Sequence, residues 1–199
     1  MKKLLFVLLV TVALLQGIHT TISAQIYPVK PARGIDLPEW QWGTTNEIWM
    51  VSSLANLWWI AAPDDMYPEL NRPPMSDRLH TFYYQTQDIN ATETHTWFPD
   101  GSGGFKGFIP IGSADVGIMY YDGRGFGING LYINRPEMDY VGLFASFNSS
   151  TFEIMNLGVS NVNITGRDYV GALVGEYGRS WINNCFSTGS VKDVTMSVD

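Results

Sequence analysis

Residues 139–144 read Asp-Tyr-Val-Gly-Leu-Phe, and residues 168–175 read Asp-Tyr-Val-Gly-Ala-Leu-Val-Gly. A second pair follows them: Ile-Met-Asn-Leu-Gly-Val at 154–159 and Ile-Asn-Asn-Cys-Phe-Ser at 182–187. Both pairs recur after nearly the same number of residues. A fixed period in the range of about 20 to 50 residues is typical of proteins built from stacked structural units. The two pairs therefore predict a repeat architecture.

The shorter pattern Ile-x-(Asn or Gly)-(Leu or Cys) begins at residues 128, 154 and 182. One period is long enough for three short strands and three turns. Parallel strands of successive periods would then stack about 4.8 Å apart. We therefore predict an all-β parallel β-helix, a solenoid with a ladder of apolar residues inside. Its predicted core residues are Val141, Leu143, Val170, Ala172, Ile154, Leu157 and Ile182.

Two polar or small residues of the repeat receive structural interpretations. Asn156 and Asn184 occupy equivalent positions, and we predict a side-chain ladder between them. Cys185 aligns with Leu157, which indicates a buried small apolar residue rather than a reactive thiol. As the only cysteine, Cys185 has no partner for an internal disulfide.

The first 24 residues have the pattern of a secretory signal peptide. Lys2 and Lys3 precede an apolar run from Leu4 to Leu15, and the small residue Ala24 suits a cleavage site. The alternative is an uncleaved N-terminal anchor. Removal of the two lysines changes the formal net charge from −7 to about −9. This acidic balance disfavours nucleic acid and anionic membranes as partners, and it favours a secreted or cell-surface protein.

Between the signal peptide and the repeats the sequence predicts two further features. Residues 25–45 contain three prolines and are expected to form an extended leader. Within it, Trp40 and Trp42 are interpreted mainly as a plug for one end of the core, with a sugar-stacking platform as the alternative. The apolar spacing of Leu54, Leu57 and Trp58 predicts a short helix near 53–62, which would cap the first coil.

Several motifs that suggest chemistry are rejected. Residues 125–130 match Gly-x-Gly-x-x-Gly, but a strand-like stretch follows them instead of the helix that a dinucleotide site needs. Asp100 lies in a glycine-rich turn without the alternating acids of a calcium loop. The Asp64-Asp65 pair is expected to be solvated, and His80 and His95 lack the spacing of metal ligands. No catalytic, cofactor-binding or metal-binding residue is therefore assigned.

Residues 169–175 followed by 182–191 resemble the GLUG motif of bacterial secreted and surface proteins. The upstream segments 53–61, 85–91, 104–112 and 121–128 are similar to the lead-in of such proteins, so the resemblance covers about residues 46–191. The earlier copy departs from the motif, because Ala145 stands where a second Gly is expected. The resemblance implies a right-handed β-helix exported by a Gram-negative bacterium, and it implies no settled catalytic residues.

The expected domain map follows from these observations. It consists of a signal peptide at 1–24, a leader at 25–45 and a β-helix domain at 46–199, with GLUG-type repeats near 128–191. Since such segments usually contain several copies, we expect the chain to be truncated at its C-terminal end. Its exposed C-terminal β-edge is then expected to pair with further repeats or with another chain.

Three functions are weighed. The first is a non-enzymatic module with an adhesive, structural or binding role, whose partners would be extracellular glycans or cell-surface proteins. The second is a polysaccharide lyase or hydrolase, which needs converging carboxylates and a base. The third is a glycan-binding module that uses Trp40, Trp42 or Trp97. The candidate residues for the enzyme are Asp88, Asp122, Asp139, Asp168, Arg124, Arg135 and Arg167.

Overall fold

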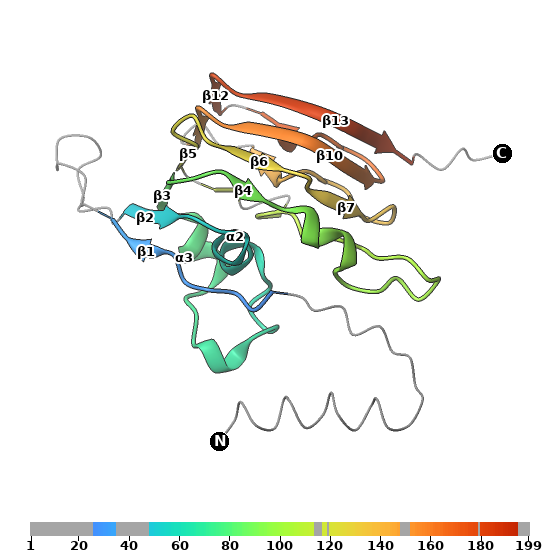
Figure 1. Ribbon diagram of the computed structural model, residues 1–199, viewed down its shortest axis with the longest axis horizontal. Coiled ribbons are helices and arrows are strands. Elements are labelled where there is room, and N and C mark those ends of the chain that lie inside the picture. The colour runs from blue at the N-terminus through green and yellow to red at the C-terminus, as the bar shows by residue number, and fades with distance from the viewer. Residues whose placement is uncertain are drawn as a thin grey trace.

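The computed structural model describes residues 26–34, 48–113, 117–118, 120–147, 152–178 and 180–194. Within these ranges the chain forms two α-helices, two 3-10 helices and 13 short strands (Figure 1). The helices are α2 (Leu54–Ala61), η2 (Pro68–Leu70), α3 (Met75–Leu79) and η3 (Thr92–Thr96). The strands are β1 (Ala32–Arg33), β2 (Ile48–Val51), β3 (Phe82–Gln85), β4 (Ile89–Asn90), β5 (Tyr120–Asp122), β6 (Gly127–Asn129), β7 (Tyr132–Asn134), β8 (Phe144–Phe147), β9 (Glu153–Met155), β10 (Gly158–Gly166), β11 (Val174–Tyr177), β12 (Trp181–Asn183) and β13 (Phe186–Asp193).

The strands belong to three sheets. The first has the order β1-β2-β3-β5-β9-β12, the second has the order β13-β10-β6-β4 with β7 also paired to β10, and the third contains β11 and β8. All these strand pairs are parallel except β1–β2, which is antiparallel. Parallel neighbours need long connections, and here a connection between two neighbours in one sheet passes through the other sheets, for example from β9 through β10 and β11 to β12.

The prediction of an all-β right-handed parallel β-helix is wrong. The chain is a mixed α and β protein, with strands in three sheets of unequal size and an antiparallel pair at one edge. The physical reason lies upstream of the repeat. The pattern that predicted the solenoid occurs only in residues 128–191, whereas α2 and α3 supply core residues such as Trp58 and Leu79, which are fully buried.

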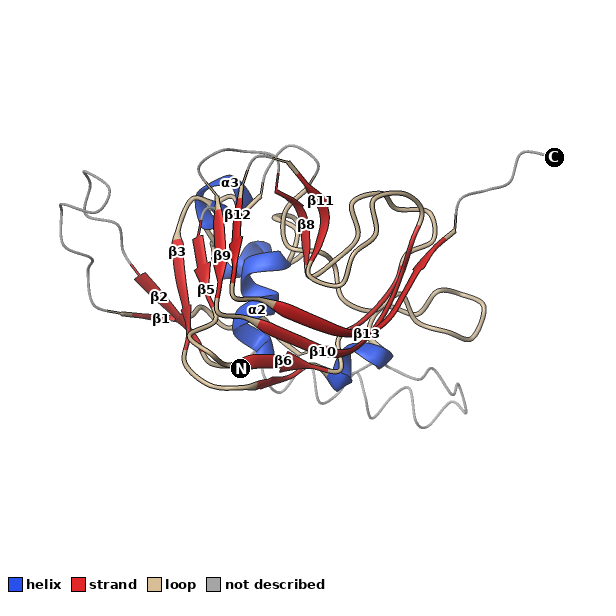
Figure 2. Cartoon of the chain, turned by 90° about the horizontal axis from the view of Figure 1, so that it is seen from above, coloured by secondary structure: helices blue, strands red, loops and turns tan. Residues whose placement is uncertain are grey.

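Helix α2 forms where the apolar spacing predicted it. Ser53 is its N-cap, and the Ser53 side chain accepts a hydrogen bond from the Asn56 backbone N–H. Seven of its eight residues are buried. In Figure 1, α2 lies at one end of the stack of strands, and β12 and β13 lie at the other end. Figure 2 looks along this stack and shows α2 within the outline of the sheets. Residues that cover the core from this end are therefore supplied by a helix.

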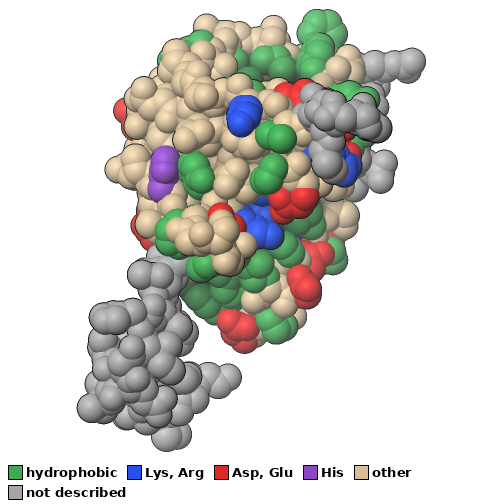
Figure 3. Space-filling model, turned by 90° about the vertical axis from the view of Figure 1, so that its right-hand side faces the viewer, with side chains coloured by type: hydrophobic (Ala, Val, Ile, Leu, Met, Phe, Trp, Pro, Cys, Tyr) green, Lys and Arg blue, Asp and Glu red, His purple; other side chains and the backbone are tan. Residues whose placement is uncertain are grey.

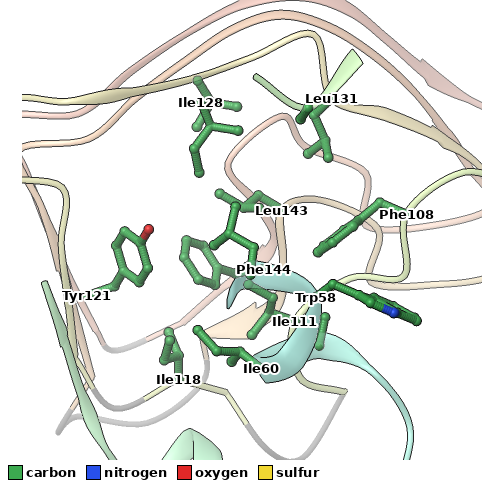
Figure 4. Packing of buried hydrophobic residues seen from close by; sticks show 14 of the residues in the cluster. Trp58, Ile60, Phe108, Ile111, Ile118, Tyr121, Ile128, Leu131, Leu143 and Phe144 are labelled. Carbon is green, nitrogen blue, oxygen red and sulfur yellow. The ribbon is translucent and has the colours of Figure 1, made fainter. Parts of the chain in front are cut away.

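The hydrophobic core is rich in aromatic rings (Figure 4). Trp58 lies 5.3 Å from Trp97 and 6.0 Å from Phe108 between ring centroids, in edge-to-face geometry. Tyr121 packs edge-on against Phe144 at 5.5 Å. Edge-to-face packing adds about 0.5–1.5 kcal/mol per pair beyond the burial of apolar area. The core thus joins α2 to the sheets through its largest side chains.

The predicted core residues of the first copy are fully buried, whereas those of the second copy are not. Val141, Leu143, Ile154 and Leu157 are fully buried, as predicted. The predictions were less accurate for the second copy, where Val170, Ala172 and Ile182 are only partly buried. Cys185 is also partly buried rather than buried, and burial raises the pKa of its thiol. The second copy forms the last strands of the three sheets, and no other strand of the described ranges lies over these side chains.

Candidate functional site

The last strands of all three sheets lie at one end of the molecule. Strand β12 pairs only with β9, β13 only with β10, and β11 only with β8. Each therefore has one edge without a strand partner among the described residues. We define the end surface as β11, β12 and β13 together with Tyr169. An exposed sheet edge presents unpaired N–H and C=O groups to any chain that approaches it.

The end surface exposes several large apolar side chains among polar ones. Its exposed fractions are 64% for Trp181, 63% for Phe186, 58% for Tyr177, 55% for Tyr169 and 44% for Val191. Figure 3 shows hydrophobic side chains at the upper end of the molecule, the end at which Figure 1 draws β12 and β13. Contiguous exposed apolar residues are typical of surfaces that contact another molecule.

Equivalent positions one strand further in are covered. Val191 pairs with Ile164, and Ile164 is fully buried. Likewise, Ile182 pairs with the buried Ile154. At these two positions the outer copy has an apolar residue like the inner one, but no described strand lies over it. At the two most exposed positions the inner strand has no large apolar residue, because Trp181 pairs with Glu153 and Phe186 pairs with Gly158.

A ladder of side chains crosses three successive strand layers and reaches this end. The Asn156 side-chain amide donates to Asp122 at 3.0 Å, and the Asn184 amide donates to the Asn156 carbonyl oxygen at 2.8 Å. The predicted Asn156–Asn184 ladder is therefore confirmed. Both asparagines have a φ of +51°, a left-handed conformation that asparagine tolerates well. Every step donates in the same direction, which leaves the Asn184 carbonyl oxygen as the outermost acceptor.

The Asp-Tyr-Val-Gly copies also lie directly against each other. Val141 and Val170 form a parallel bridge, as predicted from their equivalent positions. The Tyr140 and Tyr169 rings stack with centroids 4.9 Å apart and an interplanar angle of 5°. Arg167 binds Asp139 through two hydrogen bonds, one of them 2.6 Å from Nε to Oδ1, and lies 3.7 Å from Asp168. The two aspartates are thus engaged by an arginine at a turn.

Replacement of Asp139 by Asn is expected to lower the free energy of unfolding at pH 7 and to have little effect near pH 2. The hydrogen bonds from Arg167 hold the pKa of Asp139 below its usual value. A carboxyl with a lowered pKa in the folded state stabilises the fold above its unfolded pKa, about 3.9 for Asp, and this stabilisation is lost as the pH falls through the folded pKa. Urea unfolding of both proteins between pH 7 and about pH 2 measures the difference. An equal difference at all pH values would contradict the assignment.

The other candidate acids of the enzyme hypothesis have structural roles as well. Asp88 accepts a hydrogen bond from the Gly127 N–H at 2.7 Å, and Asp122 accepts from the Arg124 N–H at 2.8 Å. Arg135 is buried and donates to the carbonyl oxygens of Phe108 and Gly107. The Arg124 guanidinium lies 5.5 Å from the centroid of the Tyr84 ring. Each of these groups stabilises a turn or a core contact.

The motifs rejected from the sequence are structural too. Asp100 accepts from the Ser102 and Gly104 N–H groups, so it organises its own turn. Residues 125–130 contain strand β6 and are followed by strand β7, without the helix of a dinucleotide site. Asp64 differs from the expectation, because it is not merely solvated: it binds Arg78 at 2.6 Å. No group of three potential metal ligands occurs in the described ranges.

The tryptophans proposed for sugar binding do not provide an open platform in the described structure. Trp97 is fully buried, so its proposed role as a sugar platform is wrong. Trp40 and Trp42 lie outside the described residues. The exposed aromatic residues Trp181 and Phe186 were not among the residues predicted from the sequence to bind a ligand. The signal was present, since Phe186 stands where the preceding copy has Gly158 and Trp181 where it has Glu153.

Positive charge is sparse on one large face of the molecule. On the face seen in Figure 3, lysine and arginine side chains occur singly, and some of them lie beside acidic side chains. This arrangement lacks the continuous basic surface that nucleic-acid binding requires. In the described part of the chain, no helix has the length and apolar character needed to cross a membrane.

The geometry defines a mixed α and β protein in which each of the three sheets ends in a strand with one edge unpaired among the described residues. In comparisons with known proteins, no family model matches the chain. The chain is 32% identical over 118 residues to Halomucin of Haloquadratum walsbyi. The matched stretch covers 55% of this chain and about 1% of the length of Halomucin. No solved structure matches.

Proposed function

We propose that the chain is a non-enzymatic module of a secreted or cell-surface protein, and that its end surface takes up a further strand layer with the same sequence pattern. The observation that carries this proposal is the directional ladder from Asp122 through Asn156 to Asn184, which ends in an exposed acceptor. A further layer with Asn at the equivalent position would donate its amide to the Asn184 carbonyl oxygen. A further Tyr would stack on Tyr169, whose ring is 55% exposed.

The extracellular location rests on two supports. The N-terminal 24 residues have the pattern of a signal peptide. The partial similarity to Halomucin is in keeping with a surface or secreted protein. The proposal includes the resemblance of the chain to GLUG-motif proteins. Under it, the module has an adhesive or structural role.

A non-enzymatic role is supported by what the candidate catalytic groups do. General acid–base catalysis requires groups that are free to exchange protons with a substrate. Here Asp139 is bound by Arg167, while Asp88 and Asp122 each accept a backbone N–H. A polysaccharide-active enzyme would need these carboxylates to converge on a cleft. Instead, Asp122 holds its own turn, while Asp88 and Asp139 bind groups of a distant segment of the chain.

The proposal is tested by a chain that carries a second copy of residues 168–194 directly after Val194, with the added tryptophan replaced by Phe. We expect a higher free energy of unfolding, because the added layer buries Trp181, Phe186 and Val191. We also expect the fluorescence of Trp181 to shift to shorter wavelength as its ring leaves water. Subtraction of the signal of the Trp181→Phe variant of each chain isolates this emission.

Val191→Pro provides a matched control. The Val194 N–H donates inward to the Gly166 carbonyl oxygen. The N–H groups of successive residues in a strand point alternately to its two neighbouring strands. The Val191 N–H, three residues before Val194, therefore points away from β10, towards the free edge of β13. Proline is tolerated on such a free edge, and the unextended variant should unfold like Val191→Thr. In the extended chain, Val191→Pro should remove most of the added stability, whereas Val191→Thr should retain it. An unstructured added copy, or an equal gain with Pro, would reject the proposal.

A further inference from the structure

A second concave region lies away from the end surface, between the N-terminal segment and the loop that follows α2. It consists of two adjoining pockets with volumes of about 260 Å³ and 210 Å³. Both pockets are lined by Lys30, Trp59 and Pro73. Trp49 and Asp77 also line the first pocket, and Arg72 lines the second. Each volume is below the range of about 300–1,000 Å³ that is usual for drug-sized ligands, so each suits a single small ring.

The walls of these pockets are held in place before any ligand binds. The Arg72 guanidinium donates to the carbonyl oxygens of Trp59, Ala62 and Pro63, at 3.3, 3.0 and 2.6 Å. These bonds tie the proline-rich loop to the C-terminal end of α2. Proline restricts the backbone further, since its φ angle is fixed. A preformed site avoids the entropic cost of ordering side chains and loops on binding.

Positive charge gathers here in an otherwise acidic chain of net charge −7. Lys30 and Arg72 form no ion pair with a carboxylate in the described part of the chain, and the second pocket has no acidic residue in its lining. The Lys30 Nζ atom lies 4.2 Å from the centroid of the Trp49 ring. The ammonium group is thus held against an aromatic ring and keeps its hydrogen-bonding capacity for an anion.

The two pockets differ in the chemistry that they offer. The second combines Lys30 and Arg72 with the apolar surfaces of Pro28 and Leu70, which fits a ring that carries a carboxylate. The first contains Asp77 and Thr81 beside Trp49. An aspartate accepts hydrogen bonds from hydroxyl groups, and it repels a second carboxylate. The second pocket therefore suits a sugar ring that carries a carboxylate. The first pocket suits a neighbouring sugar ring whose hydroxyl groups donate hydrogen bonds.

We propose that these pockets bind a uronate-containing oligosaccharide, with the uronate carboxylate at Lys30 in the second pocket and a neighbouring sugar beside Asp77 and Trp49 in the first. Extracellular acidic polysaccharides contain such units. Binding at this site is independent of the end surface, so it extends the proposed function without depending on it. Arg78 lines the first pocket but is neutralised by Asp64, and it serves the fold.

The experiment titrates the folded chain with digalacturonate, with its methyl ester and with neutral digalactose, and it follows binding by calorimetry and tryptophan fluorescence. The ester keeps the size of the acid and removes its charge. We expect saturable binding of the acid and at least about tenfold weaker binding of the ester, since the ester cannot form the charge-assisted hydrogen bond with Lys30. Equal affinity for acid and ester, or no saturable binding of the acid, would overturn the proposal.

Two lysine variants locate the site. Lys30→Gln should weaken binding of the acid about tenfold and leave the weak binding of the ester unchanged. Lys106→Gln removes the same charge outside these pockets, where Lys106 lies 3.5 Å from Glu137, and it should bind like the original chain. The urea midpoints of both variants confirm that they are folded. Equal loss in the two variants would mean that net charge, and not this site, attracts the ligand.

Discussion

Replacement of Arg78 by Met is expected to lower the free energy of unfolding by about 3 kcal/mol or more, because several carbonyl groups lose a donor and a buried acceptor without a donor costs about 1–3 kcal/mol. The Arg78 side chain is 0% exposed. Its Nε atom donates to the Pro73 carbonyl oxygen, and its Nη atoms donate to the carbonyl oxygens of Trp59, Ile60 and Ala62. Methionine has a similar length, so it fills the space and donates none of these bonds.

The cost arises at the C-terminal end of α2. The last carbonyl groups of a helix have no partner within the helix, and here Arg78 and Arg72 supply the missing donors. Asp64 balances the charge of Arg78. Although burial alone raises the pKa of Asp64, the Met75 N–H and the Arg78 guanidinium hold this pKa below its usual value. Loss of Arg78 therefore leaves three carbonyl groups of this helix end with fewer donors, together with an unpaired carboxylate.

Urea unfolding followed by tryptophan fluorescence measures the effect. Arg124→Met is the matched control, because Arg124 is exposed and its guanidinium lies over the Tyr84 ring at the surface. A surface substitution of this kind usually changes stability by about 0.5 kcal/mol or less. If Arg78→Met cost no more than Arg124→Met, the buried guanidinium would not be what holds the loop to α2.

Local signals in the sequence predicted local structure well. The spacing of Leu54, Leu57 and Trp58 and the capping residue Ser53 define a helix whose limits depend on a few neighbouring residues. The recurring Asn156 and Asn184 predicted a contact across about one period, because equal positions in a repeat meet when the period is stacked. Both kinds of inference need only a short stretch of chain.

The prediction of the fold class was wrong because the repeat covers only part of the chain. The repeat describes residues 128–191, and extension of its geometry to residue 46 assumed that the predicted helix near 53–62 would only cap a core made of strands. Instead, Trp58 on α2 and Leu79 on α3 are part of the core itself. A helix and a strand layer can bury the same apolar area, so composition does not distinguish them.

The two candidate sites were predictable to different degrees. Exposure of Trp181 and Phe186 follows from their place in the last strands, and alignment of the copies could have identified both. The pockets around Lys30 could not be found in this way. Trp49, Trp59 and Arg72 come from a strand, a helix and a loop, and only the tertiary packing brings them together. Likewise, nothing in the sequence distinguishes the buried Trp97 from an exposed platform.

Replacement of Gly107 by Ala is expected to destabilise the fold by about 3 kcal/mol or more, through backbone strain and overpacking together. Gly107 has a φ of +73°, and a Cβ atom there would lie 2.3 Å from the Tyr132 carbonyl oxygen. That oxygen accepts a hydrogen bond from the Phe108 N–H at 2.9 Å. The Gly107 carbonyl oxygen in turn accepts from the buried Arg135 at 3.2 Å. The backbone has no room to move without losing these bonds.

Gly125→Ala separates the two causes. Gly125 has a φ of +86°, and a Cβ atom there would meet no heavy atom within 4 Å. Its substitution should therefore show the cost of the left-handed backbone alone, about 1 kcal/mol. The difference between the two variants in urea unfolding measures the close approach of the segment around Gly107 to β7. Similar losses in both variants would show that the contact at Tyr132 relaxes easily and that φ alone requires glycine at these positions.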